Sequence, residues 1–446
     1  MNNGWDIRII WLSRCSLYVA AAAMPFSVLV THIAILTFII CWFFEPALLQ
    51  RLSRLKDNYQ LLALIAFGLW MCAGISYSEK TSEAWFALER KAFFFLLPVA
   101  FGTSTIQSGR ITKNIQHIFC YSCALALLMC YSYAGYQLHL FNDGVIGSES
   151  LNYLSSSGFV AGDSKKPWMF FSYVRLAAAI NMHPTYLALY AAFCCIILVC
   201  RNFSGAISTP KQVFNGALII FFSISIIFLA SRIIVLMLSL FYLCLLVHQV
   251  FIAERKRSLK FLLCILLMAI IAGVFLNPVT RYRQVDEIVS NGITITSNKH
   301  YTNSTEIRAS LWWLAAKTYA TTNWFLGVGP GDVKDAVQQS GKTLRVTNVL
   351  DSYDPHNQYL FILLSSGLFG ILFFMIYIGM GLASAIRNHD IIFLSFLVLF
   401  LIVSLTESVL ELQKGIVFFT LFFATMNFQK AQPATITQLK LAGADK

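Results

Sequence analysis

Residues 354–370 read DPHNQYLFILLSSGLFG, a polar turn that passes directly into an apolar run. The residue before a proline is biased away from the helical conformation, so Asp354 and Pro355 favour a turn. The apolar run that follows is long enough to begin a helix that enters a membrane. The stretch therefore predicts a polar turn at a membrane surface, followed by a helix that is buried in the membrane.

The composition of the whole chain supports a membrane setting. Hydrophobic residues make up 58% of the 446 and charged residues 12%, whereas soluble domains carry about 25% charged residues. The chain is predicted to be an all-α polytopic membrane protein, with residues 1–446 forming a single transmembrane domain. Nothing beyond the net charge of +12 supports binding to nucleic acid.

Runs of about 20 apolar residues are needed to cross a hydrocarbon core. Twelve such runs predict about twelve transmembrane helices, near residues 9–24, 27–45, 59–76, 86–103, 115–137, 176–200, 214–230, 232–253, 260–276, 357–384, 390–406 and 412–428. The eleven cysteines fall within or beside these runs. We interpret them as small buried hydrophobic residues that form neither disulfides nor a metal site.

Lysines and arginines gather in alternate short loops, a pattern that marks the cytoplasmic side. They include Arg51, Arg54 and Lys56, Arg110 and Lys113, Arg201 and Lys211, the cluster Arg255–Lys256–Arg257, Arg387, and Lys430, Lys440 and Lys446. With twelve spans, all of these lie on one side. The pattern predicts a cytoplasmic-membrane protein with both termini in the cytoplasm.

Two long loops then lie on the outer side, residues 138–175 and residues 277–356. Loops of this length without a function are uncommon. The second loop, between spans 9 and 10, contains a helical pattern in STEIRASLWWLAAKTYATTN, a turn in GVGPGD and a second short helix in DVKDAVQQ with Asp332 at its N-cap.

Ionisable residues at membrane depth are functional candidates. Arg232, Arg175 and Arg308 all fall at the outer side, each with a structural alternative. Arg232 and Arg175 could be topological stops that extend to the interface. Arg308, beside two tryptophans, could belong to a helix lying on the outer leaflet.

The segment Glu89–Arg90–Lys91 places three charges just inside the fourth span. An ion pair at one helix end would explain it structurally, and we retain Arg90 and Lys91 as secondary candidates. No cluster of carboxylates has a spacing suited to a metal ion; Asp351 and Asp354 come nearest. The sequence predicts no metal and no cofactor.

His356 and Asn357 are expected to form the cap and first turn of the tenth span. The positive end of the helix dipole should keep the imidazole neutral and able to accept a proton. The alternative is that His356 only caps the helix. Gly367 and Gly370, deeper along the run, are expected to form a small-residue face for close helix packing.

Several arginines and one neutral histidine thus converge on the outer side. Arginine binds phosphate groups through two parallel hydrogen bonds and needs no metal to do so. A lipid-linked pyrophosphate at the outer leaflet would fit this set.

The pattern HN, nine residues and GLFG resembles the signature of the O-antigen ligase and polymerase superfamily of membrane glycosyltransferases. LGVGPGD and EIRASLWWLAAK resemble that family's large periplasmic loop, LASRIIVLM resembles its arginine segment, and LERKAFFFLLP resembles a further segment of bacterial members. The resemblance spans about residues 60–430.

The resemblance implies a GT-C-like fold of about twelve helices with a periplasmic loop over the site. It implies transfer of an oligosaccharide from undecaprenyl pyrophosphate to an acceptor hydroxyl at the periplasmic face, without a metal ion. His356 matches the essential histidine, Arg232 and Arg308 match arginines at the pyrophosphate, and Arg175 matches a further arginine. Asn357 and Asp354 join them as secondary candidates.

The first choice of reaction is O-antigen ligation to lipid A–core. Polymerisation of O-antigen and protein O-glycosylation remain open, because the sequence does not show the acceptor. An alternative of a different class is a transporter of an anionic lipid-linked sugar, although no inverted repeat is visible. The expected partners are the undecaprenyl-pyrophosphate-linked glycan, a hydroxyl acceptor and membrane lipid.

Overall fold

The computed structural model describes residues 3–147, 166–203, 208–251, 257–287, 289, 304–346 and 354–429. Within these ranges every regular element is helical, as the sequence predicts. Arg255, Lys256, Asp351 and the lysines after residue 429 lie outside the described residues.

The longer helices are α1 (Asn3–Ala23), α2 (Val28–Phe44), α4 (Tyr59–Ile75), α5 (Thr81–Arg90), α6 (Ala92–Thr103), α7 (Gly109–Asn142), α10 (Pro184–Phe203), α11 (Thr209–Leu229), α12 (Arg232–Phe251), α13 (Arg257–Leu276), α16 (Ser304–Ala320), α17 (Val333–Thr343), α18 (Gln358–Arg387), α19 (Ile391–Val403) and α20 (Gln413–Asn427). The short elements are α3 (Leu48–Ser53), η1 (Arg54–Asp57), α8 (Lys166–Phe170), α9 (Tyr173–Leu176), η4 (Ala177–Ile180), α14 (Pro278–Arg281), η5 (Tyr282–Asp286) and η6 (Val409–Glu411).

Each of the twelve apolar runs contains a helix over most of its length. Among the described residues, five helices are long and apolar enough to cross a membrane by themselves. Two further spans result if each of two sharply bent pairs is counted as one, Val28–Phe44 with Leu48–Asp57 and Lys260–Leu276 with Pro278–Asp286. The molecule is therefore a helical membrane protein, and the count of twelve spans remains a prediction.

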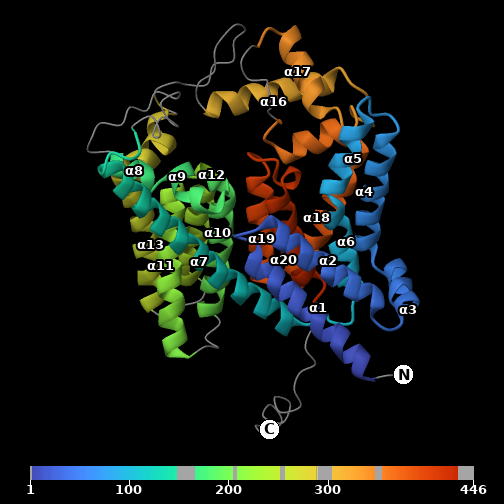
Figure 1. Cartoon of the computed structure of the whole chain (residues 1–446), viewed down its shortest axis with the longest axis horizontal. Helices are drawn as coiled ribbons and strands as arrows, with labels where there is room; N and C mark the ends of the chain where they lie inside the picture. The colour runs from blue at the N-terminus through green and yellow to red at the C-terminus, as the bar shows by residue number, and fades with distance from the viewer. Residues whose placement is uncertain are drawn as a thin grey trace.

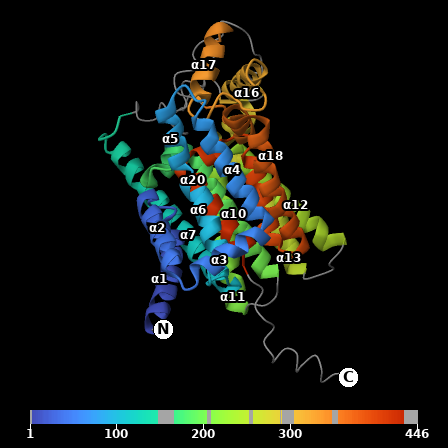
Figure 2. The same cartoon turned by 90° about the vertical axis from the view of Figure 1, so that its right-hand side faces the viewer.

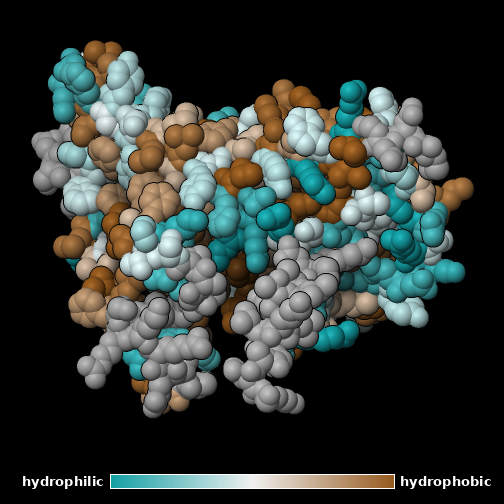
Figure 3. Space-filling view, turned by 90° about the horizontal axis from the view of Figure 1, so that it is seen from below, coloured by the Kyte–Doolittle hydropathy of each residue, from teal (hydrophilic) through white to brown (hydrophobic). Residues whose placement is uncertain are grey.

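The helices form a bundle with α16 and α17 lying across one end of it (Figure 1). The view turned by a right angle places these two helices at the same end (Figure 2). Within the bundle α4 packs along α18, α6 along α20 and α10 along α11. The opposite end of the molecule shows hydrophilic side chains among hydrophobic ones (Figure 3).

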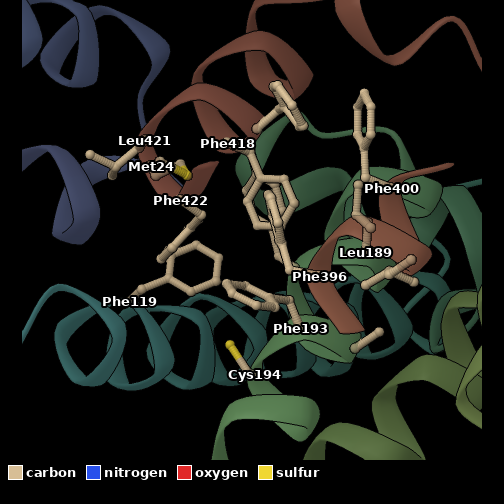
Figure 4. Packing of buried hydrophobic residues seen from close by; sticks show 14 of the residues in the cluster. Met24, Phe119, Leu189, Phe193, Cys194, Phe396, Phe400, Phe418, Leu421 and Phe422 are labelled. Atoms are coloured by element: carbon tan, nitrogen blue, oxygen red, sulfur yellow. The ribbon is translucent and has the colours of Figure 1, made fainter. Parts of the chain in front are cut away.

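Aromatic side chains fill the centre of the bundle (Figure 4). Phe119 of α7 and Phe193 of α10 meet Phe422 of α20 with ring centroids 4.8 Å away in both cases, a separation typical of favourable aromatic pairs. Phe396 of α19 joins them at 4.9 Å from Phe193. This packing fixes α19 and α20 at the centre, and with them the loop that connects them.

Some boundaries differ from the expectation. The run 86–103 is two helices, since α5 ends at Arg90 and α6 begins at Ala92. The run 176–200 becomes a helix only at Pro184, the first residue of α10, after two short turns. All eleven cysteines are free thiols, but Cys72, Cys244 and Cys264 are exposed on the bundle surface instead of buried.

The helix α18 is interrupted at Gly367, where φ is +62° and ψ is −163°. The expected packing of this glycine against another helix is wrong. It instead contacts the large loop, since a Cβ atom at Gly367 would lie 2.2 Å from the backbone oxygen of Phe325. Leu368 N donates to Trp324 O (2.8 Å), and Val328 N donates to Leu364 O (2.7 Å). The interruption frees backbone groups of α18 to hold the loop.

The turn GVGPGD anchors the other side of the same loop. Gly329 has φ of +102° and approaches Ser78 closely. Asp332 stands at the N-cap of α17 but does not cap it with its side chain. Its carboxylate instead accepts hydrogen bonds from Glu79 N (2.8 Å) and Lys80 N (2.9 Å). The large loop is thus fastened to both α18 and the α4–α5 connection.

A small second core joins the large loop to the bundle; its buried residues are Leu311, Leu314, Ala315, Val333, Val337, Val346, Phe361 and Leu364. These come from α16, α17, the segment after it and the first half of α18. The packing holds α16 over the start of α18 instead of leaving it free on a lipid surface.

The substitution Gly367→Ala is predicted to destabilise the protein strongly. An alanine would have to keep a left-handed backbone while its Cβ collides with Phe325. The matched control is Gly379→Ala in the same helix, where an added Cβ meets nothing within 4 Å. We expect a lower yield and melting temperature of purified protein for the first variant and near-normal values for the second; equal stability of the two would contradict the interruption.

Candidate active site

A cavity of about 430 Å³ opens beneath α16. Its lining comes from five places in the chain: Thr185 of α10, Ser231–Ile233 and Leu236 at the start of α12, Arg283 and Gln284 of η5, Thr305, Arg308, Ala309 and Trp312 of α16, and Thr406–Glu407 after α19. Two of the three arginines assigned to the pyrophosphate, Arg232 and Arg308, lie in this lining.

Arg232 is held by groups of the large loop. Its Nη2 donates to Glu287 Oε2 (2.5 Å), its Nη1 donates to the hydroxyl of Thr305, and its Nε donates to the backbone oxygen of Arg283. Glu287 is only 2% exposed. The guanidinium is therefore an internal group of the site, which argues against a topological stop that extends to the interface.

Arg308 projects from α16 towards the loop after α19. Its Nη2 donates to Glu407 Oε1 (2.6 Å), and the carboxylate is largely buried. The alternative of a helix lying on the outer leaflet would leave this arginine facing lipid headgroups. Its contact with Glu407 instead turns it into the cavity.

His356 lies beside the same carboxylate. Its Nδ1 is 3.4 Å from Glu407 Oε2 and 3.8 Å from Asp354 Oδ1. The residue precedes the helix, with φ of +46°, and its backbone N–H donates to Asp354 Oδ1 (2.7 Å). Glu407 thus holds Arg308 with one oxygen and faces the imidazole with the other.

The helix cap expected of His356 is made by Asn357. The side-chain oxygen of Asn357 accepts from Tyr359 N and Leu360 N (both 3.0 Å), and its amide donates to Leu405 O (3.0 Å). Since a good cap is already present, His356 is not needed for that purpose.

The electrostatics of the site follow from burial and neighbouring charge. Burial would raise the pKa of Glu407, but the hydrogen bond from His356 and the charge of Arg308 outweigh it and lower this pKa. Burial lowers the pKa of His183, which stands before α10 near the same groups. Because its pKa is lowered, the Glu407 carboxylate is ionised at neutral pH.

The secondary candidates Lys91, Arg90 and Asp354 lie in different surroundings in the structure. Lys91 is buried and its Nζ lies 2.6 Å from Glu411 Oε2, four residues after Glu407, so the ion pair is not formed at its own helix end. Arg90, its neighbour, is exposed at the end of α5. Asp354 supports the backbone of His356 and accepts from the Ser408 hydroxyl (3.2 Å).

Arg175 lies on α9 and is half-buried, but it does not line the cavity. The structure therefore brings Arg232, Arg308 and His356 to one place and leaves Arg175 outside it. A different arginine, Arg283, occupies the cavity wall.

Sequence reasoning overlooked Glu407, Glu287 and Arg283. Glu407 ends an apolar run on the outer side, and an ionisable residue in that position could have been singled out as Arg232 was. Glu287 and Arg283 lie in a polar loop, where a charged residue carries no such signal.

Within the described residues, no group of three histidine, cysteine or carboxylate side chains is placed to hold a metal ion. Of the two carboxylates that came nearest in the sequence, Asp354 binds the backbone and Ser408. Asp351 lies outside the described residues.

Glu407→Gln is predicted to lower the stability of the protein at neutral pH. It is also predicted to make that stability change less with pH in the acid range. A carboxylate with a lowered pKa contributes stability that is present above its ordinary value of 4.5 and is lost as pH falls through the folded value. Loss of hydrogen bonds to charged groups predicts a decrease of about 1.5–3 kcal/mol at neutral pH. Melting temperatures of the purified protein across a pH series would measure both effects.

The control for this series is Glu79→Gln, which removes an exposed carboxylate at the same end of the molecule. It should match the unmodified protein at every pH. Identical curves for Glu407→Gln and Glu79→Gln would contradict the role given to Glu407.

Residues 217–375 match the family model described as O-antigen ligase. The match covers less than half of the chain, from within α11 to within α18, and it includes Arg232, Arg308 and His356. No curated protein matches the chain. The resemblance noted in the sequence is confirmed by this match over residues 217–375, which are similar to the O-antigen ligase family.

Proposed function

We propose that the protein transfers a glycan from undecaprenyl pyrophosphate to an acceptor hydroxyl at the periplasmic face of the bacterial inner membrane, as an O-antigen ligase acting on lipid A–core. One observation carries the proposal. Three arginines line a cavity of about 430 Å³ whose lining also includes Ile233, Leu236 and Trp312.

A cavity of this kind suits a donor that is both anionic and lipid-linked. Leu236 is 54% exposed, so the cavity reaches the apolar surface of α12. A lipid chain could lie along that surface while its pyrophosphate meets the guanidinium groups. Arginine is suited to this because its planar fork binds phosphate oxygens in pairs.

The chemistry assigned to the site is direct displacement at the anomeric carbon. The acceptor oxygen forms the new bond to that carbon, the bond to the pyrophosphate oxygen breaks, and the acceptor proton passes to His356. The leaving group gains negative charge, which Arg232 and Arg308 stabilise. With Nδ1 of His356 turned to Glu407, Nε2 remains to receive the proton, a role that Glu407 supports by orienting the ring.

The donor chemistry is shared by ligases, O-antigen polymerases and protein O-oligosaccharyltransferases, which differ in the acceptor. Neither a metal nor a cofactor enters the proposed reaction. The surface polysaccharide of a deletion strain distinguishes an O-antigen ligase from an O-antigen polymerase. We expect polymer to accumulate on the lipid carrier; core carrying a single repeat would instead identify a polymerase.

His356→Asn and His356→Ala are both predicted to reduce transfer by about 10²–10⁴-fold, the usual contribution of a general base. Asparagine tolerates the left-handed backbone of this position, and Asn357 keeps the cap, so the fold should survive. Transfer by purified protein with saturating donor measures the effect.

The matched control is His389→Asn, at the other end of α18, where φ is +51° and the side chain is exposed. It repeats the same substitution in the same backbone conformation away from the cavity. Full activity in His389→Asn with loss in His356→Asn is the expected pattern; an active His356→Asn enzyme would remove the proposed base.

The assigned orientation makes a prediction of its own. A reporter fused after Ser340 of α17 should be periplasmic, and one fused at the C-terminus should be cytoplasmic, because the basic loops favour that side. Reporters active in only one compartment make the measurement. A cytoplasmic Ser340 would place the cavity on the wrong side for a periplasmic reaction.

A further inference from the structure

The turn that follows α14 is a π-helix, η5 (Tyr282–Asp286). Turns of this type are rare and often occur at functional sites, since the wider turn changes where side chains point. Two consecutive residues of η5, Arg283 and Gln284, line the cavity. Neither is explained by the pairs already described.

Arg283 differs from the other two cavity arginines. Arg232 and Arg308 each hold a buried glutamate, whereas no ion pair of Arg283 occurs in the part of the chain that the structure describes. Its Nε donates to Ala230 O (3.4 Å), and the side chain is 8% exposed. A buried guanidinium without a carboxylate is costly unless another anion approaches it.

The side chain of Tyr173 fixes the plane of that guanidinium. The Arg283 Cζ lies 3.6 Å from the centre of the Tyr173 ring, a stacked arrangement that favours the cation. Tyr173 itself has φ of +53°, which is unusual for an aromatic residue and persists only where its surroundings require it. The arrangement holds Arg283 ready before any ligand arrives.

Two further donors in the cavity lining are unsatisfied within the described residues. Gln284 Nε2 and Trp312 Nε1 are buried and have no hydrogen-bond partner. Buried N–H groups are almost always paired. Oxygen atoms of a ligand in the cavity would satisfy both.

We propose that Arg283 and Gln284 form a further binding subsite for the pyrophosphate of the lipid-linked donor, with the Trp312 N–H as an additional hydrogen-bond donor. The inference rests on the proposed function. The lining holds three arginines but one glutamate, Glu407, which pairs with Arg308. Glu287, which pairs with Arg232, is buried outside the lining. Arg283 therefore adds to the cavity a positive charge that no carboxylate of the described residues pairs with.

The test is Arg283→Met, which keeps much of the side-chain length and removes the charge. The bond from Arg232 to residue 283 uses the backbone oxygen, so the variant retains it. The control is Arg281→Met, two residues earlier, which is exposed and faces Asp286 at 3.6 Å. Both variants are assayed as the full chain, by binding of inorganic pyrophosphate and by the donor KM and the kcat of transfer.

We expect Arg283→Met to weaken pyrophosphate binding and to raise the donor KM by about ten- to a hundredfold, the range for loss of a hydrogen bond to a charged group. The acceptor KM and melting temperature should stay unchanged. Gln284→Met should act in the same direction with a smaller effect, and Arg281→Met should remain within about twofold in every measurement.

The variant Arg308→Met distinguishes a failure of this inference from a failure of the proposed function. Unchanged pyrophosphate binding in Arg283→Met, with binding lost in Arg308→Met, would overturn the subsite and leave the proposed function in place. Unchanged binding in both variants, or none in the unmodified protein, would overturn both. If Arg283→Met fails to fold, Arg283→Lys replaces it, and a donor KM equal to that of the unmodified protein overturns the subsite.

Discussion

One buried carboxylate joins the parts of this site. Glu407 meets Arg308 through Oε1 and His356 through Oε2, and these residues come from the loop after α19, from α16 and from the start of α18. A carboxylate in this setting must remain paired, because an isolated buried charge is strongly unfavourable. The pairing therefore joins the large loop, the histidine and the central helices at one point of the site.

The interruption of α18 gives this arrangement a rigid base. Gly367 lets the loop backbone come within hydrogen-bonding distance of α18 on both sides of the break, and Asp332 fastens the same loop to the α4–α5 connection. The histidine lies one helical segment above the break. A loop fixed at these points can present Arg308 and Thr305 to the cavity with little loss of conformational freedom when a substrate binds.

Sequence reasoning predicted the helical class, the position of nearly every helix and the convergence of Arg232, Arg308 and His356 at one end of the bundle. Hydrophobic run length and the cost of burying charge act locally, so they can be read along the chain. The prediction from sequence placed Gly367 against another helix and assigned the N-cap of α18 to His356, although Asn357 makes it. It also expected unbroken helices across Lys91 and before Pro184. These errors share a cause, since hydropathy does not show where a backbone leaves helical geometry to meet a distant segment.

The sequence by itself determined that this chain is a helical membrane protein, because apolar runs of this number and length need lipid around them. Only the tertiary structure decided which charges meet. Lys91 pairs with Glu411, Arg232 with Glu287 and Arg308 with Glu407 across 320, 55 and 99 residues of chain. The packing of α19 and α20 at the bundle centre places Glu407 and Glu411, and the turn of η5 places Glu287 beside the start of α12. No local pattern specifies a contact between segments so far apart.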